Sequence, residues 1–210
     1  SGMSASKLGV KLLFIYANPN HINNLENIIN SCFLNVNNFT AKPYTSALSA
    51  LTDEEKNQGS VCIDIGAGTT SISVFIDGSI VYAKSLNLGG WYITNDISKE
   101  LSTPFDQAEA LKTLYGSALR GANDGEEIFQ IPMIGGNDEN RLSFSRSKLI
   151  SIIKPRLWEI LMHSKKCIEQ SGYKDISNKN TIITGGTMEL PGSIEFAAVS
   201  YTHLTLPTKR

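Results

Sequence analysis

The sequence predicts an α/β protein, on three observations. Between residues 61 and 86 apolar residues alternate with other residues, and two glycine-containing turns interrupt the pattern, which is typical of consecutive strands. Apolar residues recur every three or four positions over residues 91–115 and 145–172, which is typical of helices. A short β-branched segment, residues 181–184, then leads into two glycines. Strands and helices mixed in this way indicate an α/β fold.

Composition and charge exclude several classes of protein. Of the 210 residues, 41% are hydrophobic and 19% are charged, as in an ordinary globular protein. The net charge of −1 offers no basic field, so we expect no nucleic-acid partner. The 3 cysteines are far apart, which argues against a disulfide framework or a zinc site and fits a reducing cytosol. No apolar run approaches the roughly 20 residues that a membrane-spanning helix needs.

The first 41 residues predict a small β-α-β unit. Residues 8–16 are largely apolar and predict a buried strand, and the alternating residues 33–41 predict a second one. Between them, residues 21–31 carry apolar residues at helical spacing. This unit is generic and by itself indicates no function.

Residues 42–51 predict a helix that can pack very closely on its neighbours, because small residues occupy much of it. These small residues are Ser46, Ala47, Ser49 and Ala50. The polar residues 52–56 then predict a solvated linker into the next strand.

Residues 61–65, 70–76 and 80–86 predict a three-stranded meander. Asp77 and Gly78 join its second and third strands. This pair is a strong hairpin signal, because glycine tolerates the positive φ of a type I′ turn.

The turn between the first two strands is a candidate anion site. Gly66 and Gly68 let backbone N–H groups approach an anion without a Cβ in the way, and the hydroxyls of Thr69 and Thr70 add donors. Asp64 could hold Mg²⁺ through water, because hard cations prefer oxygen ligands. The glycines alone are more often an ordinary turn. The turn is neither a Walker loop, since no Lys-Ser/Thr follows, nor a dinucleotide fingerprint, since a strand comes next.

Two helices are predicted next, over residues 91–101 and 103–115. Thr103 is a good N-cap before Pro104 at the first helical position. Gly116 suits the C-terminal cap of the second helix.

Two further groups of residues are candidates for ligand binding. Glu109 and Lys112 are three residues apart and share a helix face, and this spacing alone favours a surface ion pair. Gly185, Gly186 and Thr187 follow the last predicted strand, where backbone can approach a ligand, although the signal is weak on its own.

Residues 121–143 predict an irregular stretch with one short strand at residues 128–134. A long helix then begins near Ser145 and ends at Gly172. Pro155 lies inside its apolar pattern, so the helix is kinked there or restarts.

Residues 199–210 break off the helical pattern that precedes them. The segment resembles the translation of a sequencing adapter, so we expect that it does not belong to the natural protein. A natural polar tail is the alternative.

In their order along the chain these motifs resemble those of the actin/Hsp70/sugar-kinase superfamily of ATPases. The D-x-G-x-G-T-T of residues 64–70 is similar to the second phosphate-binding loop, residues 42–51 to the interdomain hinge helix, and residues 185–187 to the adenosine loop. Lys42 stands where Hsp70-like chains have a glutamate. The resemblance implies an actin-like (ribonuclease H-like) fold, present in part, with ATP and Mg²⁺ as ligands. It implies phosphate or Mg²⁺ binding by Asp64, Gly66, Gly68, Thr69 and Thr70, and adenosine binding by Glu109, Lys112, Gly185, Gly186 and Thr187.

Longer motifs resemble those of the FtsA family of bacterial cell-division proteins. They lie in residues 43–59, 94–97, 111–116 and 152–161. The resemblance covers nearly the whole chain from residue 3 to about residue 198. It implies the end of subdomain 1C in residues 1–42, the hinge helix and 2A hairpin in 43–98, subdomain 2B in 99–180, and a return to 2A in 181–198.

The resemblance also implies what the full-length protein does. It would bind ATP, polymerise like actin, tether FtsZ to the inner membrane at the division septum and meet other divisome proteins. It would be cytoplasmic and peripheral to that membrane, held by a C-terminal amphipathic helix that these residues do not include. In the family, the acidic C-terminal tail of FtsZ docks beside the long helix, where Lys148 and Arg156 match basic positions. Both residues could also be ordinary solvated charges.

Two other functions use a similar hairpin, namely that of a pilus-assembly actin homologue and that of a sugar- or acetate-kinase-type phosphotransferase. A kinase needs a positioned base for the accepting hydroxyl, and the sequence assigns no catalytic residue, which favours the adaptor. We expect weak ATPase activity at most. We also expect poor or no ATP binding by these residues alone, because the superfamily clamps the phosphates between two loops and one is found here.

Overall fold

The computed structural model describes residues 7, 9, 12–132, 141–177 and 180–200. It divides into two compact units, Ser1–Ala41 and Lys42–Arg210, which are described separately below. The predicted adapter-derived tail lies outside the described residues from residue 201 onward, and Val199 and Ser200 end the last helix.

The first unit contains one helix, α1 (Pro19–Ser31), among its described residues. The Asn18 side chain caps it by accepting a hydrogen bond from the Asn20 backbone N–H at 2.9 Å. The described residues of both predicted strands, 12–16 and 33–41, form no strand, so that prediction is wrong for them. A strand needs a hydrogen-bonded neighbour, and no ladder among the described residues pairs with either segment.

The second unit is built on a four-stranded sheet with the order β3-β2-β1-β6. Its strands are β1 (Ser60–Ile65), β2 (Thr70–Ile76), β3 (Ser79–Leu86) and β6 (Thr181–Thr184). The pairs β1–β2 and β2–β3 are antiparallel, whereas β1 and β6 are parallel. The predicted meander is therefore confirmed, and the last strand returns to pair with the first.

The turn between β2 and β3 has the predicted chemistry. Asp77 (φ 50°) and Gly78 (φ 73°) both have positive φ, as a type I′ turn requires. A bulge between Val74 and Phe75 shifts the register of the β2–β3 pair, and the alternation of side chains continues on either side of it.

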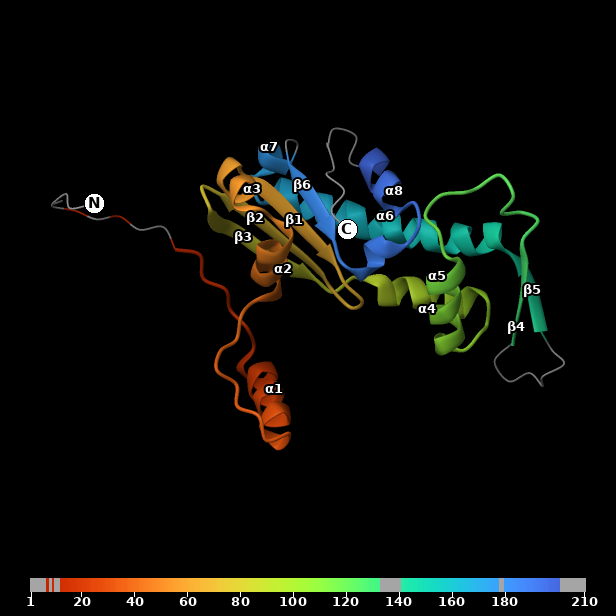
Figure 1. Ribbon diagram of the computed structural model, residues 1–210, viewed down its shortest axis with the longest axis horizontal. Helices are drawn as coiled ribbons and strands as arrows, with labels where there is room; N and C mark the ends of the chain where they lie inside the picture. The colour runs from red at the N-terminus through yellow and green to blue at the C-terminus, as the bar shows by residue number, and fades with distance from the viewer. Residues whose placement is uncertain (1–6, 8, 10–11, 133–140, 178–179, 201–210) are drawn as a thin grey trace. The chain divides into compact units, whose positions relative to one another are not determined.

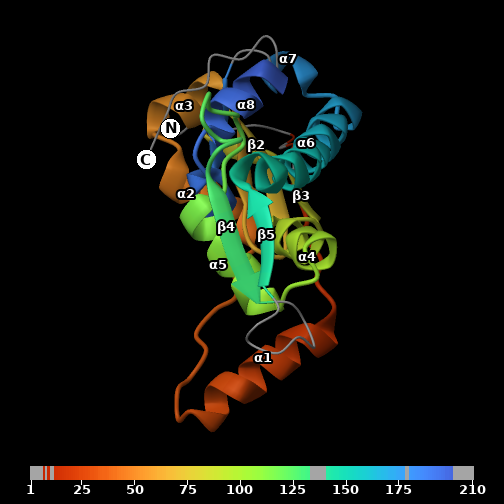
Figure 2. The ribbon, with the colours of Figure 1, turned by 90° about the vertical axis from the view of Figure 1, so that its right-hand side faces the viewer.

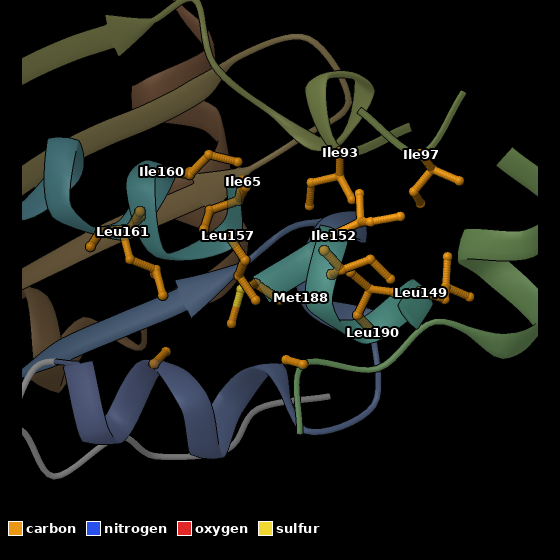
Figure 3. Close-up of a cluster of buried hydrophobic side chains, with 14 of the residues drawn as sticks. Ile65, Ile93, Ile97, Leu149, Ile152, Leu157, Ile160, Leu161, Met188 and Leu190 are labelled. Carbon is orange, nitrogen blue, oxygen red and sulfur yellow. The ribbon is translucent and has the colours of Figure 1, made fainter. Parts of the chain in front are cut away.

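Helices cover both faces of the sheet, as the two views show (Figure 1, Figure 2). On one face, apolar residues of β1 and β2 such as Ile63 and Ile72 join the main core with α6 (Arg146–Gln170). On the other face, Cys62 and Phe75 pack with Ala47 of α2 (Lys42–Ala50). Figure 3 shows part of the main core, where side chains from β1, α4, α6 and the loop after β6 meet.

The polar segment after α2 is a helix, α3 (Asp53–Gln58), and not the predicted solvated linker. Thr52 and Glu55 form a capping box: the Thr52 hydroxyl accepts from the Glu55 backbone N–H, and the Glu55 carboxylate accepts from the Thr52 backbone N–H at 2.7 Å. These reciprocal bonds stabilise a helix of only 6 residues.

Helices α4 (Gly90–Glu100) and α5 (Phe105–Tyr115) follow the meander, close to the predicted bounds. The predicted N-cap is wrong: Pro104 is the capping residue, with an extended ψ of 147°, and Thr103 is a buried residue before it. Gly116 does end α5, but its φ is −65° and so is not left-handed. Glycine is needed here because a side chain would be too close to its neighbours. A Cβ there would lie 3.0 Å from Leu190 Cδ2.

The rest of the unit is a hairpin and a long helix. Strands β4 (Ile128–Pro132) and β5 (Arg141–Ser145) pair in antiparallel fashion; β5 was not predicted, and residues 133–134 of the predicted first strand lie outside the described residues. Ser145 caps α6, which runs through Pro155 without restarting. Three short elements complete the unit: α7 (Lys174–Ser177), a 3-10 helix η1 (Gly186–Glu189) and α8 (Ser193–Ser200). Among the described residues, no helix is long and apolar enough to cross a membrane.

Candidate functional site

The turn between β1 and β2 presents a run of unused backbone donors. The Gly66 N–H donates to the Thr69 carbonyl at 3.0 Å and closes the turn. The N–H groups of Ala67, Gly68 and Thr69 meet no acceptor among the described residues, and Ala67 and Gly68 are exposed. Successive free N–H groups of this kind can receive an anion.

The two glycines of this turn differ in what they do. Neither has a positive φ. A Cβ on Gly68 would meet nothing within 4 Å, whereas a Cβ on Gly66 would lie 2.8 Å from the Lys42 ammonium nitrogen. A Cβ at residue 66 would therefore force the flexible end of the Lys42 side chain to shift, whereas residue 68 has space for one and no positive φ that opposes it.

The two threonines also differ. The Thr70 hydroxyl is buried and donates its proton to the Leu88 carbonyl at 2.8 Å, which ties the segment after β3 to the turn. Thr69 is half-buried, and its hydroxyl has no partner among the described residues. Of the two predicted hydroxyl donors, Thr69 is thus the one left available to a ligand.

Asp64, the predicted Mg²⁺ residue, ends β1 beside α2. Its Oδ2 atom accepts from the Ser46 hydroxyl at 2.5 Å and lies 3.1 Å from the Lys42 ammonium nitrogen. Its side chain is only 11% exposed. On the other side, the missing side chain of Gly185 leaves room for Oδ1, since a Cβ there would lie 2.5 Å from Asp64 Oδ1. Sequence reasoning missed Lys42 and Ser46 as neighbours of this carboxylate.

Glu109 and Lys112 form the expected ion pair, at 2.7 Å, with Thr94 of α4 as a third member. The Thr94 hydroxyl donates to Glu109, and Lys112 donates to Thr94 at 2.8 Å. Partial burial by itself raises the pKa of the Glu109 carboxyl, but the hydrogen bonds from Lys112 and Thr94 and the lysine charge outweigh it and hold that pKa below its usual value. Glu109 is therefore a fixed carboxylate at neutral pH.

The Gly66 carbonyl oxygen joins three parts of the chain. It accepts from the Gly90 N–H at the start of α4, at 2.9 Å, and from the Thr187 hydroxyl at 3.0 Å. Gly185 precedes Thr187 with a φ of 101°, which a residue with a side chain rarely adopts. These contacts hold the turn, α4 and the loop after β6 together.

A cavity of about 350 Å³ opens where these parts meet. Of the predicted adenosine residues, Glu109, Lys112, Gly186 and Thr187 line it, while Gly185 lines a neighbouring hollow of about 660 Å³. None of the five predicted phosphate residues lines it, although Ala67 in their midst does. Its full lining is Ala67, Gly90, Glu109, Lys112, Thr113, Gly186, Thr187, Glu189 and Leu190.

The two basic residues predicted for partner binding lie on α6 and are both paired. The Arg156 guanidinium forms a fork with Asp96 of α4, at 2.6 and 3.0 Å, and also donates to Glu159 at 2.5 Å. The hydrogen bond to Asp96 is the main reason why the pKa of Arg156 is raised. Lys148 lies 3.6 Å from Glu100, and both side chains are largely exposed.

The described residues contain no cluster of three or more histidine, cysteine, aspartate or glutamate side chains that could hold a metal. At the turn, Asp64 is the residue predicted to contact Mg²⁺ through water. Hard cations can be held in this way through water and phosphate oxygens.

Comparison with known proteins gives the family. The family described as "Cell division protein FtsA" matches residues 61–207. Curated relatives of that name include those of Rhizobium meliloti (strain 1021), 38% identical, and of Pseudomonas aeruginosa, 33% identical, each over 93% of this chain. The chain spans 44% and 46% of their lengths.

Solved structures give the fold. The chain is similar to MreB5 of Spiroplasma citri bound to ADP, with a TM-score of 0.69, 17% identity, and coverage of 91% of this chain and 61% of that one. It is also similar to a PilM–PilN type IV pilus biogenesis complex, with a TM-score of 0.66, 18% identity, and coverage of 88% and 46%. These likenesses confirm the predicted actin-like ATPase fold. The family match decides among members of that fold: the chain belongs to the FtsA family of cell division proteins.

Proposed function

We propose that this chain contributes the second phosphate loop and the adenosine side of an ATP site in a cell-division protein. The observation that carries the proposal is the cavity of about 350 Å³, because segments distant in sequence converge on it beside a turn whose N–H donors meet no acceptor in the described part of the chain. A structural relative, MreB5 of Spiroplasma citri, is described as bound to ADP in one structure and to AMPPNP in another.

Each part of the site has a chemical role in this proposal. The N–H groups of residues 67–69 and the Thr69 hydroxyl would donate to phosphate oxygens. The Glu109 carboxylate and the Lys112 ammonium group would face the nucleoside, where a carboxylate can accept hydrogen bonds from sugar hydroxyls. Asp64 would hold Mg²⁺ through water when the nucleotide brings it.

The complete protein, in this proposal, polymerises and tethers FtsZ to the inner membrane at the division septum. It would be cytoplasmic, peripheral to that membrane and in contact with other divisome proteins. Residues 1–42 would belong to subdomain 1C, 43–98 and 181–198 to 2A, and 99–180 to 2B. The parallel pairing of β6 with β1 supports the joining of the two 2A segments into one sheet.

The acidic tail of FtsZ would meet α6 at Lys148 and Arg156. Both cations are held by carboxylates of this chain, so an incoming carboxylate would compete with Glu100 and Glu159. Arg156 keeps its fork with Asp96 in this arrangement, and that fork orients the guanidinium for a further acceptor.

Calorimetry with ATP and Mg²⁺ on the complete protein that carries this chain tests the nucleotide site. Lys112→Met removes the ammonium that fixes Glu109 and should weaken ATP binding about tenfold, since a hydrogen bond to a charged group is worth about 1.5–3 kcal/mol. Lys174→Met, whose side chain is exposed and away from the cavity lining, is the matched control and should bind like the wild type. Equal affinities of the two variants would contradict the site. Robust phosphate transfer to small metabolites without FtsZ binding would contradict the function.

A further inference from the structure

The Lys42 ammonium group lies at the point where a cation would be expected. Lys42 begins α2, and its Nζ atom is 3.1 Å from Asp64 Oδ2. The missing Cβ of Gly66 leaves room for it, because a Cβ there would lie 2.8 Å from Nζ. The ammonium is thus placed between the one carboxylate of the turn and the turn's own backbone.

The Asp64 carboxylate already has one cation beside it. Oδ2 accepts from Ser46 and contacts Lys42, and the side chain is only 11% exposed. A divalent cation that approached this carboxylate through water would meet an ammonium of the same sign at short range. Like charges repel each other at such distances, and the repulsion is strongest where burial excludes water.

Lys42 itself remains able to bind an anion. Its side chain is 47% exposed, and an ammonium group has three donors, so contact with Asp64 leaves others free. The exposed N–H groups of Ala67 and Gly68 belong to the same turn. A lysine ammonium is a compact point charge and is a common ligand of phosphate.

We propose that Lys42 is a phosphate-binding residue that acts as a tethered cation at Asp64 and makes nucleotide binding less dependent on Mg²⁺. The inference rests on the proposed nucleotide site. In that site, the Lys42 ammonium group would bind a terminal phosphate oxygen of the nucleotide and neutralise its charge.

The test is the ratio of the ADP dissociation constant in EDTA to that in Mg²⁺, measured by calorimetry on the complete protein. For the wild type we expect a ratio within about threefold, because the ammonium stays in place when the metal is removed. Lys42→Met should raise the ratio about tenfold, mainly through weaker binding in EDTA, as expected for the loss of one charge-assisted hydrogen bond. Lys84→Met, at an exposed position of β3, is the control and should keep the wild-type ratio.

A second variant separates the charge of Lys42 from its bulk. Lys42→Arg keeps a cation at this position and should keep the ratio closer to that of the wild type than Lys42→Met does. An unchanged ratio in Lys42→Met, or equal ratios in Lys42→Met and Lys42→Arg, would overturn the role of Lys42 while leaving the nucleotide site intact. Absence of ADP binding by the wild type in both conditions would overturn the nucleotide site and this inference together.

Discussion

Replacement of Gly185 by alanine should destabilise the protein severely, and replacement of the next residue, Gly186, should not. Gly185 has φ 101° and ψ 154°, a region that is essentially restricted to glycine and costs other residues about 1–3 kcal/mol. A Cβ would also lie 2.5 Å from both Asp64 Oδ1 and the Ile65 carbonyl oxygen, so buried backbone must shift. Overpacking of this kind costs about 1–3 kcal/mol more.

The two costs give a total loss of about 2–6 kcal/mol for Gly185→Ala, a large part of the roughly 5–15 kcal/mol that stabilises a typical domain. Gly186 opens η1, and a Cβ there meets nothing within 4 Å, so Gly186→Ala should change the free energy of unfolding by less than about 1 kcal/mol.

Urea unfolding followed by circular dichroism measures both variants against the wild type. With a slope of roughly 2 kcal/mol per molar urea, Gly185→Ala should lower the midpoint by about 1–3 M. Midpoints of the two variants within about 0.3 M of each other would refute the reasoning. The backbone of Gly185 would then adapt to a side chain.

Three further predictions follow from burial and charge. Burial, with a smaller effect of the Asp64 charge, raises the pKa of the Cys62 thiol to about 12. At pH 8 a thiol reagent should therefore label exposed Cys32 quickly and Cys62 only after denaturation. Comparable labelling rates of the two cysteines in the folded protein would contradict this. The pKa of Glu109 is lower in the folded than in the unfolded state, so its ion pair stabilises the fold above the unfolded-state pKa, and this stabilisation is lost as the pH falls through the folded-state pKa. Glu109→Gln should therefore lower the melting temperature at pH 7 and leave it unchanged in acid. Leu157→Ala, at a fully buried position, should cost about 2–5 kcal/mol in urea unfolding, whereas Trp158→Ala, at a 51% exposed position, should cost much less.

Local patterns predicted the second unit well and the first unit poorly. In the meander, the alternation of residues 61–65 and 70–76 is enough, because apolar residues alternate with smaller or polar ones along β1 and most of β2 and the extra residue of the bulge lies in β3. Residues 12–16 and 33–41 have apolar strand-like patterns too, yet pairing depends on a neighbour that the pattern does not contain. The helix at 53–58 carries a local signal, since Thr52 and Glu55 form the S/T-x-x-E pattern of a capping box, although its polar composition is also typical of a linker.

The candidate site was predictable where its residues are close in sequence. Glu109 and Lys112 pair because residues three apart share a helix face. Thr94 joins them from another helix, and Lys42 reaches Asp64 from 22 positions away (64 − 42), so no local spacing predicts either contact. Arg156 is a similar case: its motif was visible, but its fork with Asp96 depends on how α4 packs against α6.

Gly90 and Thr187 constrain each other in any redesign or natural drift of this chain. A Cβ on residue 90 would lie 2.6 Å from the Thr187 hydroxyl oxygen, the same oxygen that donates its proton to Gly66. The order of substitutions therefore matters: shortening residue 187 first leaves space for alanine at residue 90, whereas the reverse order passes through a crowded intermediate. Substitutions at these two positions, 97 residues apart (187 − 90), are thus expected to depend on each other.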